Sequence, residues 1–202
     1  MKVLLGISGA SGAVYGVRTI SLLLARGADL HVLVTKTAWG ILAADVGDGK
    51  VPGGADARRR WLAHLSSSDR PFRLYAEDDF GIPFASGSNA PDAMIVAPCS
   101  MGTLGRIAHG VSSSVLTRCA DVALKERKPL VLVARETPLS VIHLENMLTL
   151  ARAGAHVLPA CPGFYHRPET VSGLVDFVVS RALSCIGVDA GVLPRWGEGK
   201  EE

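Results

Sequence analysis

A glycine-rich turn near the start of the chain has the composition of a phosphate-binding turn. Gly6–Gly12 (GISGASG) begins at the end of the apolar segment Lys2–Ile7 and precedes an amphipathic one. Glycines let backbone N–H groups approach a phosphate, the helix N-terminus adds positive charge, and the two serines add hydroxyl donors. The spacing is not the G-x-G-x-x-G of dinucleotide sites, and Thr35 and Lys36 stand where an acidic ribose partner would follow the next apolar segment. The turn therefore favours a mononucleotide over NAD, with a tight turn that binds nothing as the alternative.

Pro98–Thr103 (PCSMGT) places small and hydroxyl residues directly after a third apolar segment. Ser100 is a favourable N-cap residue for the helix expected to begin there. The free N–H groups of that helix suit a phosphate or the edge of a flavin ring. Plain helix capping explains the same residues without a ligand.

Arg135 and Glu136 form a charged pair directly after the apolar run LVLVA. Charges at such a position cost free energy unless they are used. The guanidinium suits a phosphate or a carbonyl group, and the carboxyl suits a general acid if partial burial raises its pKa. A structural ion pair is the alternative.

The loop Pro162–Pro168 (PGFYHRP) carries a phenol, Tyr165, between aromatic and basic neighbours, and Arg181 lies on the helix expected to follow. A phenol and an arginine can hold a phosphate without a metal. Alternatively, Tyr165 only anchors its loop by packing.

The segments that must position these residues alternate between short apolar runs and amphipathic stretches. The sequence predicts strands at Lys2–Ile7, Leu30–Val34, Phe72–Tyr75, Ala93–Ala97, Leu130–Ala134 and Ala155–Leu158. It predicts helices at Ala13–Arg26, Thr37–Ala44, Ala55–Leu65, Met101–His109, Val115–Lys125, Ser140–Ala153 and Val171–Ile186. Turn residues dominate Val46–Gly54 and Gly81–Pro91, which are expected to be loops.

This alternation predicts an α/β fold, a Rossmann-like doubly wound, mostly parallel sheet with helices on both faces. We expect one domain over residues 1–202, with a C-terminal tail at about 188–202. Ligands of such sheets bind at the carboxyl ends of the strands. The segments following the strands should therefore form one edge, the carboxyl rim, which comprises Ser8–Gly12, Thr35–Lys36, Pro98–Thr103, Arg135–Glu136 and Pro159–His166.

Composition excludes several classes of function. The 202 residues carry a formal charge of +2, which argues against nucleic acid as a partner, and Arg58–Arg60 and Lys125–Lys128 are interpreted as solvated faces. No apolar run reaches the length of about 18 residues that spans a membrane, and no signal peptide is visible, so we expect a cytoplasmic protein. The four cysteines and six histidines show no ligand spacing, so we expect no metal site.

Several stretches together resemble the flavin prenyltransferase (UbiX) family. The resemblance covers most of the chain except roughly residues 46–80, and its most specific part is RETPLS followed by HLENM. The other stretches are GISGASGAVYGVR, FASGSNAPDAMIVAPCSMGTL, LTRCADVALKERKPLVLVA, LPACPGFYHRPE and LPRWGE.

The resemblance implies an activity that joins the dimethylallyl group of dimethylallyl phosphate to N5 and C6 of reduced flavin mononucleotide (FMN) without a metal. The product, prenylated FMN, would serve a UbiD-type decarboxylase. The family implies a cytoplasmic homo-oligomer, a dodecamer, with sites at subunit interfaces. Whether the donor is the monophosphate or the diphosphate stays open.

Site residues follow by motif match. The flavin-binding positions are Gly9, Ala10, Ser11, Thr35, Ser100, Met101, Gly102, Thr103 and Arg135. The positions around the allylic phosphate are Ser86, Arg118, Lys125, Tyr165 and Arg181, with Trp196 closing the site. The catalytic positions are Glu136, Lys125, Ser11 and Asp45.

Asp45 departs from the family pattern, which commonly has glutamate there. The carboxylate is retained but is one methylene shorter. We interpret Asp45 as the group that moves a proton through Ser11 or a water, with a solvated helix-end carboxylate as the alternative.

Two other functions compete with this interpretation. An FMN-dependent cysteine decarboxylase would share the fold and the first turn, and Cys161 is compatible with it. A non-catalytic flavin carrier would bind flavin without turnover. The basic and phenolic residues assigned to the allylic phosphate favour the prenyltransferase, because neither competitor needs them.

Overall fold

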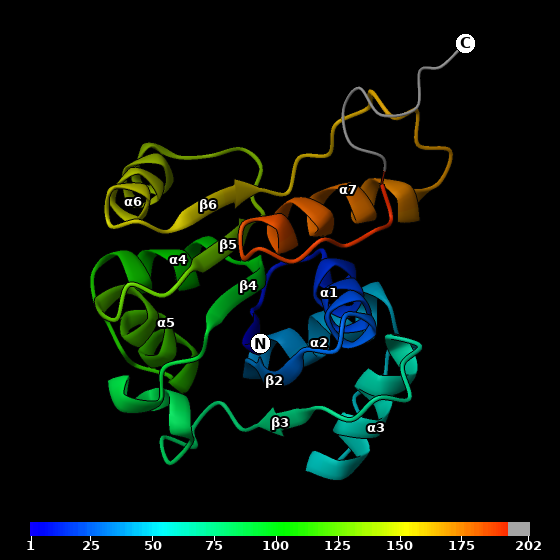
Figure 1. The fold of residues 1–202 in the computed structure, drawn as a ribbon, viewed down its shortest axis with the longest axis horizontal. Helices are drawn as coiled ribbons and strands as arrows, with labels where there is room; N and C mark the ends of the chain where they lie inside the picture. Colours follow the sequence, from blue (N-terminus) through cyan, green and yellow to red (C-terminus); the bar gives the residue numbers. More distant parts are fainter. Residues whose placement is uncertain (194–202) are drawn as a thin grey trace.

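The computed structural model of the chain describes residues 1–193. Its six strands form one all-parallel sheet in the order β3-β2-β1-β4-β5-β6 (Figure 1). The strands are β1 (Lys2–Ile7), β2 (Asp29–Val34), β3 (Arg73–Tyr75), β4 (Ala93–Cys99), β5 (Leu130–Ala134) and β6 (His156–Pro159). The α-helices are α1 (Ala13–Ala25), α2 (Lys36–Asp45), α3 (Ala55–Leu65), α4 (Met101–Ala108), α5 (Val115–Lys125), α6 (Val141–Arg152) and α7 (Val171–Ser184).

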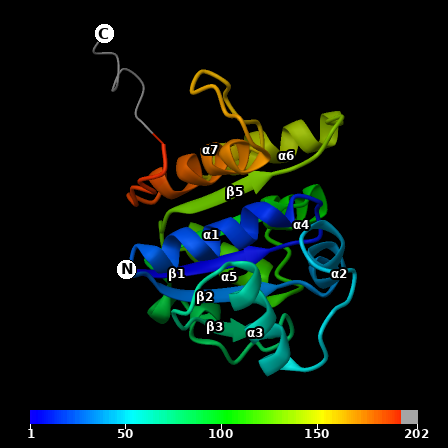
Figure 2. The same cartoon turned by 90° about the vertical axis from the view of Figure 1, so that its right-hand side faces the viewer.

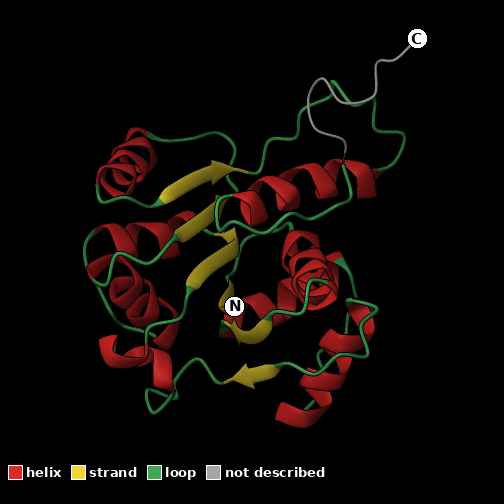
Figure 3. Ribbon diagram, viewed as in Figure 1, coloured by secondary structure: helices red, strands yellow, loops and turns green. Residues whose placement is uncertain are grey.

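Helices cover both faces of the sheet (Figure 3). Alternate residues of each strand point to opposite faces, so Val3 and Leu5 pack with α1, α2, α3 and α7, whereas Leu4 and Met94 pack with α4, α5 and α6. The central strands β1, β4 and β5 are almost entirely buried, which explains their continuous apolar sequence. The expected fold class is confirmed.

All expected helices and strands are present, with ends that differ by at most two residues. The largest difference in a strand is in β4, which continues through Pro98 to Cys99. The expected loop 81–91 contains two short 3-10 helices, Pro83–Ala85 and Gly87–Asn89. Phe84 fixes the first of them, because its side chain is fully buried against the α5 face of the sheet.

The strand order reverses at the centre of the sheet, between β1 and β4. From β1 the chain adds β2 and β3 toward one edge of the sheet, and from β4 it adds β5 and β6 toward the other edge. β1 and β4 pair in parallel from Val3–Ala93 to Gly6–Val96. Ligands of doubly wound sheets bind at such a reversal, outside the carboxyl ends of the two strands. Ser8–Gly12 follows β1, and Pro98–Thr103 begins in the last two residues of β4. The two segments meet there, where the Ser8 N–H donates to the Pro98 carbonyl at 3.2 Å. Figure 2 shows the strands from the side, with β1 and β5 running toward the same edge.

Within residues 1–193, no helix is long and apolar enough to cross a bilayer.

The buried His31 on β2 makes stability depend on pH. Burial lowers the pKa of its imidazole, more than the nearby Asp29 carboxylate raises it. Its Nδ1 lies 2.9 Å from the Tyr75 hydroxyl. The unfolded chain therefore takes up a proton more readily than the folded one, so stability is complete above the unfolded pKa of about 6.5 and is lost as pH falls below it.

We expect the free energy of unfolding to fall between about pH 7.5 and 5.5, and the fall to be smaller in His31→Gln, which cannot titrate. Urea unfolding at both pH values measures the difference. The exposed His109→Gln is the control and should retain the full pH dependence. A pH dependence in His31→Gln equal to that of the unaltered chain would exclude His31 as its source.

Candidate active site at the carboxyl rim

The glycine turn after β1 is held by a carboxylate from the far end of α2. Asp45 Oδ2 accepts hydrogen bonds from the backbone N–H of Gly12 (2.7 Å) and of Ala13 (3.1 Å), and from the Ser11 hydroxyl (3.2 Å). Gly12 has a φ of 103°, a left-handed conformation that favours glycine. No side chain of the turn itself caps α1, so Asp45 supplies the cap from a distant segment.

This contact changes the interpretation of the turn. The first N–H groups of α1, which we expected to receive a phosphate, bind the Asp45 carboxylate. Ser8 was expected to offer its hydroxyl to a ligand, and that expectation is wrong. Its side chain is fully buried, donating to the Pro98 carbonyl (3.0 Å) and accepting from the Ser100 N–H (2.8 Å). Ser8 instead fastens β1 to the end of β4.

The start of α2 is also capped by a distant carboxylate. Thr35 is the N-cap residue, and its hydroxyl accepts from the Ala38 N–H at 3.3 Å. The backbone N–H of Lys36, the first residue of α2, donates to Glu77 Oε2 at 2.5 Å. The Glu77 carbonyl accepts from the Val115 N–H, so this residue links α2 with α5. Glu77 lies in a stretch without a motif, so no pattern in the sequence points to it.

The start of α4 contributes hydroxyls and an exposed backbone. Ser100 caps Thr103, and the two hydroxyls lie 3.0 Å apart. Gly102 is exposed in the first turn of the helix, whereas Met101 is buried. The neighbouring Cys99 is inert, because burial raises the pKa of its thiol to about 12.

Arg135 lies beside the glycine turn with part of its guanidinium group unused. A Cβ placed on Gly12 would lie 3.8 Å from Arg135 Cγ, so the arginine stem passes close to the turn. The Arg135 Nε atom is buried and has no hydrogen-bond partner within the described part of the chain. A buried N–H without a partner is costly, and an anionic or carbonyl group of a ligand would satisfy it. The rim therefore leaves one buried donor beside the glycine turn for a ligand that carries such a group.

Glu136 is exposed in the single chain, so the partial burial on which its role as a general acid depended is not provided by one chain. Its Oε1 accepts from the Thr137 N–H at 3.1 Å, which orients the carboxyl group. Arg135 and Glu136 line a small hollow of about 120 Å³ together with Cys161. Arg135 and Glu136 do not form an ion pair with each other, so the structural ion pair that was the alternative to a ligand-binding role is not found among residues 1–193.

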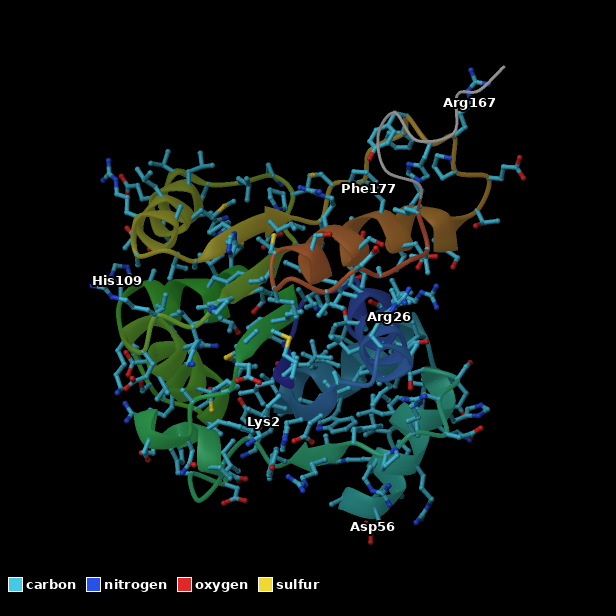
Figure 4. The ribbon with its side chains drawn as sticks, viewed as in Figure 1. Lys2, Arg26, Asp56, His109, Arg167 and Phe177 are labelled. Carbon is cyan, nitrogen blue, oxygen red and sulfur yellow. The ribbon has the colours of Figure 1, made fainter. Side chains whose placement is uncertain are left out.

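Tyr165 and Arg181 line one groove of about 390 Å³ between α7 and the segment 187–193. The Tyr165 ring packs edge-on against Phe177, 5.7 Å between centroids. Figure 4 shows Phe177 on α7 and Arg167 on the loop above it. The structure thus brings together the phenol and the arginine assigned to a phosphate. Trp196 lies outside the described residues.

The other three residues assigned to the phosphate form a separate group. Arg118 Nε donates to the Ala85 carbonyl at 3.0 Å. Ser86 follows Ala85 between the two 3-10 helices, and Lys125 lies with Arg118 on α5. Lys125 ends α5 just before β5 begins, so it lies toward the amino ends of the strands, and it pairs with Glu126. One chain therefore does not assemble the complete set. Within residues 1–193 no group of three or more His, Cys, Asp or Glu side chains is placed to hold a metal.

Known proteins resemble the chain over nearly its whole length. The model of the family described as Flavoprotein matches residues 1–183. The flavin prenyltransferase UbiX of Pseudomonas aeruginosa is 46% identical over 198 residues, covering 98% of this chain and 94% of that protein. The chain belongs to the flavin prenyltransferase family. The UbiX of Alkalihalophilus pseudofirmus is 45% identical and covers 96% of this chain and 94% of that protein.

Solved structures of the family share the fold. The crystal structure of AnUbiX (PadA1) in complex with FMN and dimethylallyl pyrophosphate has a TM-score of 0.84 and 36% identity, covering 96% of both chains. A dodecameric FMN-dependent UbiX-like decarboxylase from Escherichia coli O157:H7 has a TM-score of 0.81 and 39% identity, covering 94% of this chain and 96% of that one. The cysteine decarboxylase TvaF, with a TM-score of 0.59 and 18% identity, shares the fold alone.

Proposed function

We propose that this enzyme transfers the dimethylallyl group of dimethylallyl phosphate to reduced FMN, giving prenylated FMN for a UbiD-type decarboxylase. The observation that carries the proposal is identity of 46% with a flavin prenyltransferase over nearly the whole chain. The rim supports it independently, because Arg135 leaves a buried N–H for a ligand beside the glycine turn. No metal takes part in the proposed reaction, and we place the enzyme in the cytoplasm.

Each rim residue has a proposed task. Arg135 Nε, the exposed start of α4 and the Gly9–Ser11 turn would hold the flavin. The reduced flavin, when bound, supplies the ring atoms that take up the allyl group. Tyr165 and Arg181 would hold the phosphate as it leaves, and Glu136 would give it a proton. The Ser11 hydroxyl, hydrogen-bonded to Asp45, would pass a proton to that carboxylate.

The separation of the phosphate-contacting residues supports an active site shared between copies of the chain. Ser86, Arg118 and Lys125 would complete the site of a neighbouring subunit. One face of α6 is available for such contacts, because four of its apolar side chains are exposed: Val141, Ile142, Leu144 and Leu148. We therefore propose that the chain forms a homo-oligomer, with a dodecamer as in the Escherichia coli relative.

The FMN-dependent cysteine decarboxylase remains the alternative enzyme. Cys161 is exposed and lines the same hollow as Arg135 and Glu136, which is compatible with that function. However, the pairing of Tyr165 with Arg181 in one groove has no use in decarboxylation of a cysteine. A non-catalytic flavin carrier is distinguished by turnover, since only the prenyltransferase releases one phosphate for each flavin converted.

We expect the chain to bind FMN and not flavin adenine dinucleotide, because no acidic residue directly follows β2 to hold the ribose on the adenine side. Fluorescence titration of the apoprotein with both flavins measures this preference. Exclusive tight binding of the dinucleotide would reject the proposed cofactor. The release of phosphate under anaerobic conditions, one per reduced FMN, then tests the reaction itself.

We expect Arg181→Ala to weaken dimethylallyl phosphate by about 10- to 100-fold, because a charge-assisted hydrogen bond is lost, and Tyr165→Phe to weaken it less. Flavin affinity should stay unchanged in both variants. Separate titrations of the two ligands provide the measurement. Equal weakening of flavin and dimethylallyl phosphate would show that the groove on α7 does not hold the phosphate.

A further inference from the structure

A groove rich in positive charge lies beside α3, in the part of the chain where the resemblance to the family is poor. It measures about 540 Å³ and runs between the second half of α3 and the loop leading to β3. We call it the α3 groove. Its polar lining residues are Arg59, Arg60, His64, Ser67, Ser68, Asp69 and Arg70.

Within the described part of the chain, the arginines of this groove form no ion pair with an acidic side chain. Within residues 1–193, arginine side chains form ion pairs at Arg18–Asp176 and Arg118–Asp121, and neither pair involves the groove. Asp69 lines the groove but forms no ion pair with its arginines. Three arginines and one aspartate line the groove, which leaves it positive at neutral pH.

Arg58 precedes these residues in the sequence, and its guanidinium group makes contacts within the chain. Its guanidinium lies over the Trp39 ring, 4.9 Å from the centroid, and its Nε donates to the Pro52 carbonyl at 3.0 Å. The run Arg58–Arg60 is therefore not one solvated face, as we expected from the sequence. One arginine anchors α3, and two line the groove.

Like charges gathered in a concave surface repel one another, and a bound anion relieves that repulsion. The guanidinium fork matches the oxygens of a phosphate, and serine hydroxyls add donors at the same place. A volume of about 540 Å³ exceeds what a single phosphate needs, and three arginines can engage more than one. These features favour a ligand with two adjacent phosphate groups.

The α3 groove is separate from the carboxyl rim. α3 ends before β3 begins, so the loop with Arg70 lies near the amino ends of the strands. A Cβ on Gly27, in the turn from α1 to β2, would lie 3.9 Å from an Arg70 guanidinium nitrogen. Figure 4 shows Asp56, at the start of α3, on the opposite side of the molecule from Phe177 and Arg167.

We propose that the α3 groove binds the diphosphate group of a small molecule, inorganic or esterified. This site is distinct from the one that would hold the allylic phosphate. Arg59, Arg60 and Arg70 bind the phosphate oxygens, and the serine hydroxyls of the loop complete the contacts.

Calorimetric titration tests the proposal in the Arg181→Ala background, where the phosphate-holding groove on α7 is weakened. The probes are pyrophosphate, ADP and orthophosphate, at about 50 mM salt with FMN present. The test variant adds Arg59→Ala and Arg60→Ala. The matched control adds Lys50→Ala and Arg152→Ala, which remove the same charge from exposed sites elsewhere.

We expect pyrophosphate to bind about tenfold or more weakly in the test variant, while the control binds it normally. Orthophosphate should bind more weakly than pyrophosphate. Binding of ADP assigns the groove to diphosphate esters, and binding of pyrophosphate alone assigns it to the inorganic ion. Equal pyrophosphate affinity in test and control variants would overturn the proposal. A changed subunit number in the test variant, measured by sedimentation, would also overturn it, because the groove would then be a contact between copies.

Discussion

Replacing Glu136 by glutamine is expected to slow phosphate release by about 10²- to 10⁴-fold while leaving flavin affinity unchanged. The allylic phosphate leaves most readily when a proton is supplied to it, and glutamine cannot supply one. The substitution keeps an oxygen that can accept from the Thr137 N–H, so the local geometry of the loop is preserved. Single-turnover measurement of phosphate release under anaerobic conditions gives the rate.

The control for this variant is Glu145→Gln, which alters an exposed carboxylate on α6. It should release phosphate at the normal rate. Glu136 is exposed in the single chain, so we expect the flavin or a neighbouring subunit to cover it in the working site. If Glu136→Gln releases phosphate at the rate of the unaltered enzyme, this carboxyl group has no part in the chemistry.

Loss of the Asp45 carboxylate should have a comparable effect on a different step. We expect Asp45→Ala to let phosphate leave but to slow closure of the new ring by about 10²- to 10⁴-fold, because no base accepts the proton passed by Ser11. The structure adds a second consequence. The two backbone N–H groups at the start of α1 lose their cap, which should cost about 1–2 kcal/mol of stability.

Asp45→Asn separates these two roles. Its amide oxygen can still accept from the Gly12 and Ala13 N–H groups, but the amide cannot take up a proton. Thermal stability and flavin affinity should therefore stay near normal while ring closure remains slow. Asp45→Glu restores the carboxylate common in the family and should close the ring.

A time course that resolves phosphate release from ring closure decides the role of Asp45. Normal ring closure in Asp45→Asn, together with low stability in Asp45→Ala, would make this residue a helix cap and nothing more. The proton transfer would then belong to another group.

The fold was predictable because its signals are local. The buried strands β1, β4 and β5 are short apolar runs, and the amphipathic period of α1 and α5 follows from the same burial. The strand order places Ser8–Gly12 beside Pro98–Thr103, as the rule for doubly wound sheets requires. The two 3-10 helices Pro83–Ala85 and Gly87–Asn89 were not predicted, because turn residues alone do not specify them.

The site was less predictable because its contacts join distant segments. No spacing rule brings the Asp45 carboxylate to the Gly12 N–H, or that of Glu77 to the Lys36 N–H. The glycine-rich sequence around Ser8 suggested a hydroxyl that donates to a ligand. That hydroxyl instead makes two hydrogen bonds to the segment at the end of β4. Motif matching named Lys125 and Tyr165 for one phosphate, but it cannot say that they lie on separate parts of one chain.

Anaerobic incubation of the enzyme with reduced FMN and dimethylallyl phosphate, followed by mass analysis of the extracted flavin, tests the central claim most directly. We predict that the FMN mass increases by one dimethylallyl unit less a proton, and that one phosphate is released for each flavin converted. Unchanged FMN after incubation with fully assembled enzyme would contradict the proposed prenyl transfer. Decarboxylation of a cysteine substrate by the same preparation would instead support the alternative enzyme.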